Sequence, residues 1–424
     1  MAQTTHSLKY PKYRWIIACL LILITILKLY FLSVTAPMMS ALMENFNTDL
    51  TIMGYSSTIV STFMGVFMFV GVVIVGKWGV KRCYIFCCAS LLLGNFICLL
   101  SPSIGMFIFG RAFVGIGYGI SGTLGAATVY MWFPPVERPM IFTANVMGST
   151  IAQLFGYNIT IPMYNAFGWK TIFGVCVGLS AIALLLWVFF GKELDADTLK
   201  DKSVGNNTAA AKERAFDGLR FAFRSKELWI LAIFMTCITL ANSGNNFFFP
   251  TFLSQVRGLS AAAASSVTSV FFLASTIGSL AGGVVAIALG RRKPIVIAVG
   301  FGLLIGYLSL FTSTSIPMLI AAMSFTGFMN LMNPAVQSAA LEVPDMTPSK
   351  AAGANSMMYG FGSIMTLFIS PILGGLSGAI GLTGAMVAFI VTLISIAIIV
   401  SFFFKDRGPK VKKRAIHKFG VDGD

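Results

Sequence analysis

Long apolar runs alternate with short polar segments along almost the whole chain. A helix that crosses a bilayer needs about 20 mainly apolar residues. Twelve runs come close to this length, at 15–38, 51–75, 83–100, 104–131, 139–163, 171–191, 228–252, 262–289, 294–313, 316–341, 351–376 and 380–404. Backbone inside lipid must satisfy its own hydrogen bonds, so only helices and closed barrels can cross, and these runs are too long for barrel strands. The pattern predicts an all-α membrane protein with twelve transmembrane helices.

One long polar segment separates the runs into six and six. It predicts an N-terminal six-helix bundle at 1–191, a cytoplasmic linker at 192–227, a C-terminal six-helix bundle at 228–404 and a basic cytoplasmic tail at 405–424. Within the linker, the stretch RAFDGLRFAF at 214–223 places Phe216, Leu219 and Phe223 on one face of a helix. This amphipathic helix is expected to lie on the inner membrane surface, or else to be a solvated linker helix.

Composition excludes several classes of protein. Hydrophobic residues make up 57% of the 424 residues and charged residues 11%, whereas soluble domains average about 45–50% and about 25%. A disordered chain and a soluble enzyme are therefore excluded. The formal charge of +15 does not indicate a nucleic-acid binder, because the basic residues occupy the segments between the spans.

The basic residues fall mainly on one side of the predicted bundle. Short cytoplasmic loops carry an excess of Lys and Arg. With the N-terminus inside, the outer loops hold only Lys170 and Arg257, whereas the inner segments hold Lys9, Lys12, Arg14, Lys77, Lys81, Arg82, Arg138, Arg291, Arg292, Lys293 and Lys350. Both termini are therefore expected in the cytoplasm, and the protein in the cytoplasmic (inner) membrane.

Charged residues at membrane depth are the strongest functional signal. Lys28 and Arg111 lie within spans, whereas every Asp and Glu lies in a loop or tail. A charge at the bilayer centre costs about 2.5–3.5 kcal/mol on insertion scales, so such residues usually face a cavity or a partner. Because no carboxylate lies at that depth, an anionic solute is the natural counter-charge. Lys28 is expected to bind it, and Arg111 either binds it or holds the bundle together.

Other chemistry is sparse. The two histidines, His6 and His417, lie in the tails, and the seven cysteines include no Cys-x-x-Cys pair. We therefore expect no metal site, no histidine proton relay and no cofactor. The chain also offers no nucleophile–base pair, so it is not expected to be an enzyme.

The two halves repeat one another weakly. Gly79 matches Gly290, Gly115 matches Gly327, and TAN at 143–145 matches GAN at 353–355, each pair 210–212 residues apart. A near-constant offset predicts two six-helix repeats related by an axis along the membrane normal, with a binding site at their interface.

Three motifs carry a resemblance to a known family. They are GKWGVKR at 76–82 with its echo GRRK at 290–293, GRAFVGIGYGISG at 110–122 followed by WFPPVER at 132–138, and FGWKTIF at 167–173. With the six-plus-six layout, the chain resembles the major facilitator superfamily of secondary transporters over essentially its whole length. The resemblance implies transport by alternating access, with basic turns that contact helix ends when the inner gate is shut. It assigns that gating role to Lys77, Arg82, Arg291 and Arg292.

The chain also departs from this family in places that bear on function. The Asp usual in the basic turn is replaced by Gly76, and in its echo by Ile287, so the latch is expected to depend on the cations alone. Organic-anion relatives often carry a Glu where this chain has Tyr118, so proton coupling through that carboxylate is not carried over. Span five also lacks the Gly-Pro run of drug/proton antiporters, which argues against a drug exporter.

Polar residues at mid-depth supply the remaining candidates for binding. In this family spans one, four, seven and ten line the cavity, and the candidate neutral contacts are Tyr118, Gln153, Asn242, Asn246, Asn330, Asn333 and Tyr359. Hydrogen bonds between helices are the alternative role for such groups. Pro37, Pro250 and Pro334 suit gating kinks, because proline frees a backbone carbonyl.

These observations predict a monomeric transporter that moves a small organic anion, such as a mono- or dicarboxylate, across the bilayer. It resembles a uniporter or an exchanger of anions more than a proton pump with a carboxylate relay, although a proton could travel with the substrate. An exporter of lipophilic drugs or cations and a non-transporting membrane sensor are the alternatives. No nucleic-acid partner is expected.

Overall fold

The computed structural model describes residues 12–133, 137–193, 215–332, 336, 339–340, 343 and 348–406. Its helices are α1 (Arg14–Ser33), α2 (Met39–Phe46), α3 (Leu50–Trp78), α4 (Val80–Leu100), α5 (Ile104–Trp132), α6 (Arg138–Phe190), α8 (Ala215–Arg224), α9 (Lys226–Gln255), α10 (Ala261–Leu289), α11 (Lys293–Thr312), α12 (Ile316–Phe328), the 3₁₀ turn η2 (Met329–Met332), α14 (Pro348–Asn355), the π-helical turn η3 (Ser356–Gly360), α15 (Phe361–Met365), the 3₁₀ turn η4 (Thr366–Phe368) and α16 (Ile369–Phe402).

Two of the long helical stretches each contain two spans. Within α6 the chain turns at Gly168 (φ 77°), and within α16 it turns at Gly381 (φ 73°). Glycine tolerates these positive φ values because it has no Cβ. Nine helical stretches in the described ranges are long and apolar enough to cross a membrane, and two of them, Met140–Phe190 and Gly353–Phe402, contain these turns. With the shorter apolar α12, they account for the twelve expected spans, so the predicted fold class is confirmed.

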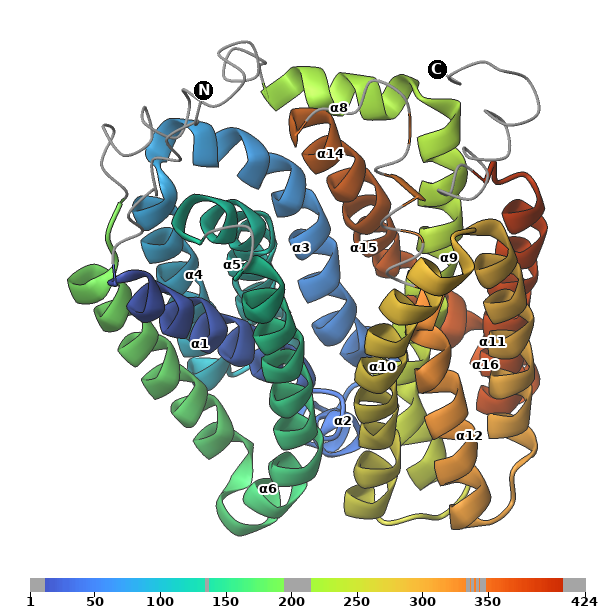
Figure 1. Cartoon of the computed structure of the whole chain (residues 1–424). Helices are drawn as coiled ribbons and strands as arrows, with labels where there is room; N and C mark the ends of the chain where they lie inside the picture. The colour runs from blue at the N-terminus through green and yellow to red at the C-terminus, as the bar shows by residue number, and fades with distance from the viewer. Residues whose placement is uncertain are drawn as a thin grey trace, which may run out of the picture.

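The helices form two bundles that stand side by side (Figure 1). The first bundle contains α1–α6 and the second α9–α16. One buried apolar cluster lies wholly within the first bundle, whereas the other fills the second bundle and continues into the first, with Met39, Leu42 and Phe107 among its members. We call the end that carries α8 and the turns at Gly79 and Gly290 the linker end. The opposite end, with α2 and the turns at Gly168 and Gly381, is the far end.

Helices α6 and α3 of the first bundle join it to the second. α6 packs along α10, and α3 packs along α15 and α16. On the α3 side the backbones approach closely, because a Cβ built on Gly65 would lie 2.4 Å from the carbonyl oxygen of Gly360. At the far end α2 lies between the bundles (Figure 1), and its Met39 and Leu42 are completely buried. The far end of the interface is therefore closed in this structure.

The linker helix α8 packs on the second bundle. Of its residues from Gly218 onward, Gly218 and Ala222 are buried, and a Cβ on Gly353 of α14 would lie 2.4 Å from the Gly218 carbonyl oxygen. The Phe223 ring also lies 6.3 Å from the Phe69 ring of α3. The described part of the packed face thus centres on these small residues and on Phe221, which is partly buried against the apolar cluster of the second bundle, whereas Phe223 is exposed; the side chain of Phe216 lies outside the described set. Contact of the outer face with a membrane stays a prediction.

Candidate functional site

Lys28 lies on the last two turns of the apolar helix α1 and faces α5. Its side chain is 8% exposed. The ammonium donates a hydrogen bond to Ser121 Oγ at 3.3 Å and lies 4.9 Å from the centroid of the Tyr118 ring. A cation over an aromatic face gains up to about 2 kcal/mol when both are desolvated. Lys28 is therefore held by neutral groups that leave its charge uncompensated.

The described carboxylates lie far along the bundle from Lys28. Those near the far end are Glu44 and Asp49, and those near the linker end are Glu137, Glu193, Glu227 and Asp406. Several are engaged there, as in the ion pairs Arg14–Glu137 at 2.7 Å and Lys405–Glu227 at 3.7 Å. Among the described residues, none of these acids pairs with Lys28, so its positive charge is available to a solute.

Arg111 is the second cation at membrane depth, and it is completely buried. Its Nη1 donates to the carbonyl oxygen of Phe31 at 2.5 Å, its Nη2 to that of Leu32 at 3.3 Å, and its Nε to that of Ser56 at 3.0 Å. α1 ends at Ser33, and the last four carbonyls of a helix have no partner within it. Arg111 therefore caps the end of α1 and ties it to α3, which favours the bundle-holding role over solute binding.

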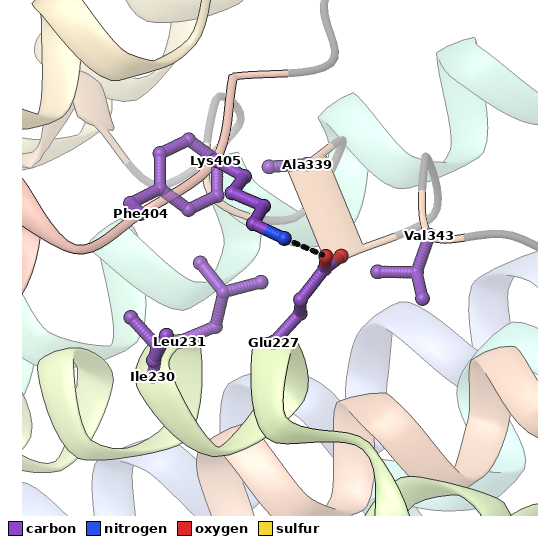
Figure 2. Close-up of a pocket in the computed structure, with 7 residues that line it drawn as sticks. All are labelled: Glu227, Ile230, Leu231, Ala339, Val343, Phe404 and Lys405. Carbon is purple, nitrogen blue, oxygen red and sulfur yellow. Dashed lines mark ion pairs between the residues drawn. The ribbon is translucent and has the colours of Figure 1, made fainter. Parts of the chain in front are cut away.

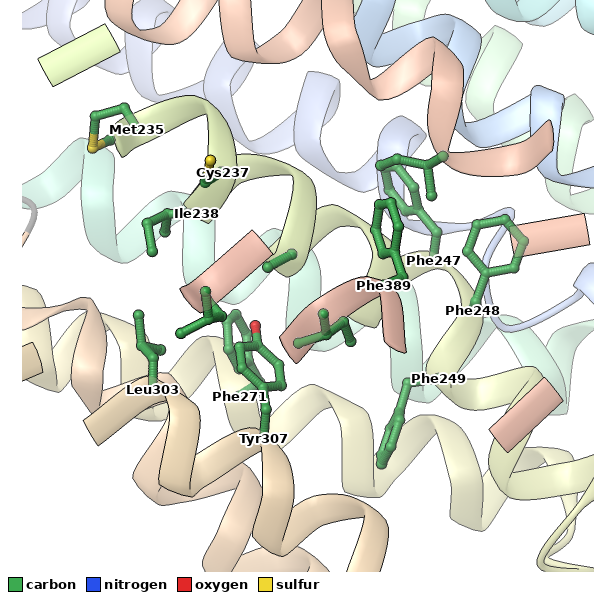
Figure 3. Packing of buried hydrophobic residues seen from close by; sticks show 14 of the residues in the cluster. Met235, Cys237, Ile238, Phe247, Phe248, Phe249, Phe271, Leu303, Tyr307 and Phe389 are labelled. Atoms are coloured by element: carbon green, nitrogen blue, oxygen red, sulfur yellow. The ribbon is translucent and has the colours of Figure 1, made fainter. Parts of the chain in front are cut away.

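Two candidate asparagines of the second bundle, Asn242 and Asn330, form an internal network around α9. Asn242 Oδ1 accepts a hydrogen bond from the Tyr307 hydroxyl at 2.6 Å, and Asn242 Nδ2 donates to Asn330 Oδ1 at 3.4 Å. Asn330 Nδ2 in turn donates to the Gly327 carbonyl oxygen at 3.0 Å. Tyr307 comes from α11 and lies among apolar side chains (Figure 3). These amides thus already serve as helix–helix bridges.

The other neutral candidates in the described ranges lie at partly exposed positions. Tyr118, Gln153, Asn246 and Tyr359 are all half-buried. Asn246 Oδ1 is buried without a hydrogen-bond partner, as are both polar atoms of its completely buried neighbour Asn245. Asn333 lies outside the described residues. Among the candidate amides of the second bundle that the structure describes, Asn246 is the one whose side-chain oxygen has no hydrogen-bond partner.

The basic turns lie at the linker end as expected, but acidic groups accompany them. Asp406 Oδ1 accepts a hydrogen bond from the backbone N–H of Arg292 at 3.0 Å, and Lys293 Nζ donates to the carbonyl oxygen of Phe402 at 2.6 Å. In the first bundle, the carboxylate of Glu193 lies against Gly79. Glu193 follows the last span of the first half and lies at the N-terminus of α4, the third span of that half. Asp406 follows the last span of the second half and lies at the N-terminus of α11, its third span. Negative charge is stabilised at a helix N-terminus.

These contacts add two acidic residues to the surroundings of the predicted latch. Glu193 lies beside the turn at Gly79 and Asp406 beside the turn at Gly290, so the cations are not the sole charged groups at these turns. Arg82 is exposed, Arg291 is half-buried and Arg292 is buried, while the side chain of Lys77 lies outside the described set. A gating role for these four residues stays a prediction.

A pocket at the linker end lies apart from these candidates. Figure 2 shows it between the start of α9 and the segment after α16, with the Glu227–Lys405 ion pair inside it. Its lining residues are Glu227, Ile230, Leu231, Ala339, Val343, Phe404 and Lys405. Because its charges already pair with each other and no predicted solute contact lines it, we do not assign the solute to this pocket.

Several residues of the site are not indicated by the sequence pattern. Ser121 and Tyr307 lie within long apolar spans that carry other polar residues as well, and nothing in their spacing connects them to Lys28 or Asn242. Glu193 and Asp406 do carry a signal. Each follows a lysine directly after the last span of its half, and the two lie 213 residues apart.

Comparison with known proteins agrees with this architecture. The family model described as Major Facilitator Superfamily matches residues 21–267 and 233–420. The hexuronate transporter of Bacillus subtilis (strain 168) is 26% identical over 388 residues, which cover 84% of this chain and 87% of that protein. The probable galactarate/D-glucarate transporter of the same organism is 23% identical over 430 residues, with 91% of this chain and 90% of that protein covered.

Solved structures share the fold at low sequence identity. A bacterial homologue of the human lysosomal transporter Spinster, inward-facing and unoccupied, superposes with a TM-score of 0.73 at 16% identity, covering 93% of this chain and 98% of that one. The xylose transporter from E. coli, in a partially occluded inward-open conformation, also gives 0.73, at 14% identity and with 94% and 99% covered. These likenesses show the twelve-helix fold.

Proposed function

This chain belongs to the major facilitator superfamily of membrane transporters, and we propose that it carries a small organic anion. The observation that carries this proposal is the Lys28 ammonium, which is buried at mid-depth against Ser121 and Tyr118. A buried charge without a compensating partner is costly. A carboxylate on the solute would supply that partner each time the site is loaded.

The relatives support the same class of solute. Two of them are named for hexuronate and for galactarate or glucarate, which are carboxylates that also carry hydroxyl groups. In the proposed site Lys28 binds a carboxylate, while Tyr118, Gln153 and Asn246 are neutral groups suited to hydroxyls. Arg111, Asn242 and Asn330 are left out of this set, because their polar atoms already hold helices together.

We further propose that the linker end faces the cytoplasm. The described basic side chains near the linker end include Lys81, Arg82, Arg220, Arg224, Lys226 and Lys293, whereas Lys170 and Arg257 lie near the far end. This asymmetry follows the rule that cytoplasmic loops are rich in Lys and Arg. The closed far end would then face outward, and the solute would exchange with the cytoplasm in this state.

The test is a thermal-shift series on the purified protein with D-glucuronate, D-glucarate, D-glucose and tetraphenylphosphonium. Ligand binding raises the unfolding midpoint by mass action. We expect the two carboxylates to raise it and glucose and the cation to leave it unchanged. Stabilisation by tetraphenylphosphonium alone would instead favour the drug and cation exporter.

Lys28→Met tests the residue itself, because it removes the charge and keeps much of the side-chain volume. This variant should fold, lose stabilisation by both carboxylates and lose their uptake into proteoliposomes. Lys170→Met is the matched control, because Lys170 is also a lysine but is exposed at the far end and belongs to neither basic turn. Normal carboxylate uptake by Lys28→Met would refute the proposed role.

A further inference from the structure

Pro250 gives α9 an unusual backbone acceptor. Within an α-helix the N–H of residue 250 would bond to the carbonyl of residue 246, but proline has no N–H. Pro250 lies inside the continuous helix Lys226–Gln255, so the carbonyl oxygen of Asn246 is left without its intrahelical donor. Deep in a bundle, such a freed carbonyl needs another partner.

Tyr157 of the first bundle supplies that partner. Its hydroxyl donates to the Asn246 carbonyl oxygen at 2.7 Å, and its side chain is only 2% exposed. Its ring packs against Phe272 of α10 with centroids 5.1 Å apart, which fixes the direction of the hydroxyl. A side chain of α6 thus completes the hydrogen bonding of α9 across the interface between the bundles.

We propose that Tyr157 is a positioning residue that latches the closed far end through the carbonyl freed by Pro250. Because the donor and the acceptor lie in different bundles, the bond exists only while these parts of α6 and α9 are in contact. When the far end opens, the Asn246 carbonyl loses its donor, so the bond favours the closed state. The same bond fixes the backbone of Asn246, whose free carboxamide oxygen belongs to the proposed solute site.

Asn158, the next residue on α6, provides a matched control. It also bridges the bundles, with Nδ2 donating to Ser269 Oγ at 3.0 Å and Oδ1 accepting from Ser266 Oγ at 2.8 Å. Both partners are side chains of α10, and neither depends on Pro250. The Tyr157 bridge therefore depends on the carbonyl that Pro250 frees, whereas the Asn158 bridge does not.

A double-mutant cycle between Tyr157→Phe and Pro250→Ala tests the latch. Alone, Tyr157→Phe leaves the Asn246 carbonyl without a donor, and we expect the unfolding midpoint to fall by about 2–4 °C. In the Pro250→Ala background the alanine N–H also donates to that carbonyl, so the carbonyl keeps a donor when the tyrosine hydroxyl is removed. Tyr157→Phe should then lower the midpoint by less than it does in the wild-type background. The control Asn158→Leu should produce the same fall in both backgrounds, because sites without a shared partner are additive.

A distance measurement reports the latch directly. Spin labels at Ala166 of α6 and Gln255 of α9, both exposed at the far end, follow the separation of the bundles after the exposed Cys19 has been replaced by Ser. Tyr157→Phe and Pro250→Ala should each increase the population at long distance, and the double variant should match Pro250→Ala alone.

Equal losses of stability from Tyr157→Phe in both backgrounds, or an unchanged distance distribution, would overturn the latch. Neither measurement uses a solute. A failure of the latch is therefore distinguishable from a failure of the proposed anion specificity.

Discussion

Replacing Arg111 should weaken the fold rather than the affinity for the solute. The substitution Arg111→Leu removes all three hydrogen bonds to carbonyl oxygens and leaves those of Phe31 and Leu32, at the end of α1, without a donor. Arg111→Lys keeps the charge. However, an ammonium is a compact point donor, whereas the planar guanidinium is a fork that reaches two helices at once.

The expected size of the effect follows from the bond lengths. A hydrogen bond to a charged group contributes about 1.5–3 kcal/mol, and the bonds to Phe31 and Ser56, at 2.5 and 3.0 Å, are the two strong ones. Removal of the guanidinium also removes a buried charge that is costly to desolvate, so we take the lower end of the range. The estimate is about 3 kcal/mol for Arg111→Leu and about half of that for Arg111→Lys. The corresponding falls in midpoint are about 6–12 °C and about 3–6 °C.

The chain carries its own reporter for this measurement. Six of its seven free cysteines are buried, so a thiol-reactive fluorophore reports unfolding as they become accessible. Arg257→Leu is the matched control. Arg257 Nη2 also donates to a carbonyl oxygen near the end of a helix, that of Phe311 at 2.6 Å, but it lies in the half-exposed loop at the far end. Water can replace its bond there, so its loss should shift the midpoint by less.

Solute binding separates the two roles that the sequence leaves open for Arg111. If Arg111 caps α1, Arg111→Lys should retain stabilisation by an anionic solute, measured as the rise above its own lowered midpoint. An unchanged midpoint together with lost stabilisation by the solute would refute the capping role and make Arg111 a solute contact.

Two further substitutions test packing between the bundles and inside the second one. Gly65→Ala places a Cβ 2.4 Å from the Gly360 carbonyl oxygen. Overpacking against backbone costs about 1–3 kcal/mol, so transport should slow by roughly tenfold. The control Gly178→Ala adds a Cβ that has nothing within 4 Å, so it should not slow transport. Asn245→Leu replaces a completely buried amide that has no partner for either polar atom. The unfolding midpoint of this variant should rise by about 2–4 °C. A fall would mean that a bound water satisfies the amide.

The sequence predicts the helices well, because the bilayer imposes one length and one kind of surface on them. The break between spans five and six is expected at 164–170 and occurs at Gly168, and the break between spans eleven and twelve is expected at 377–379 and occurs at Gly381. A turn between two apolar helices needs only a few residues and a glycine, and both are visible in the sequence. The sequence does not predict which face of α8 packs on the second bundle, because small residues pack well only against a specific neighbour, here Gly353.

The site is less predictable than the fold because polar atoms find partners on distant helices. Asn242 is indicated by its depth, but its engagement by Tyr307 depends on how α9 and α11 are rotated, which hydropathy does not encode. Tyr157 shows the same limitation. Its neighbour Asn158 bonds to side chains of α10, whereas Tyr157 reaches a carbonyl of α9 whose availability depends on a proline elsewhere in the sequence.

The two intramembrane cations illustrate why depth alone does not assign a role. Both carry one positive charge, and neither pairs with a carboxylate among the described residues. Arg111 has donors in a rigid fork and lies where α1 ends, so carbonyl oxygens that the helix cannot use compensate its charge. Lys28 lies in α1 itself, five residues before the last helical residue Ser33, where the backbone carbonyls are already bonded within the helix. Its ammonium therefore contacts only a hydroxyl group and an aromatic face. The difference between the structural cation and the cation proposed to bind the solute therefore arises from the point at which α1 ends.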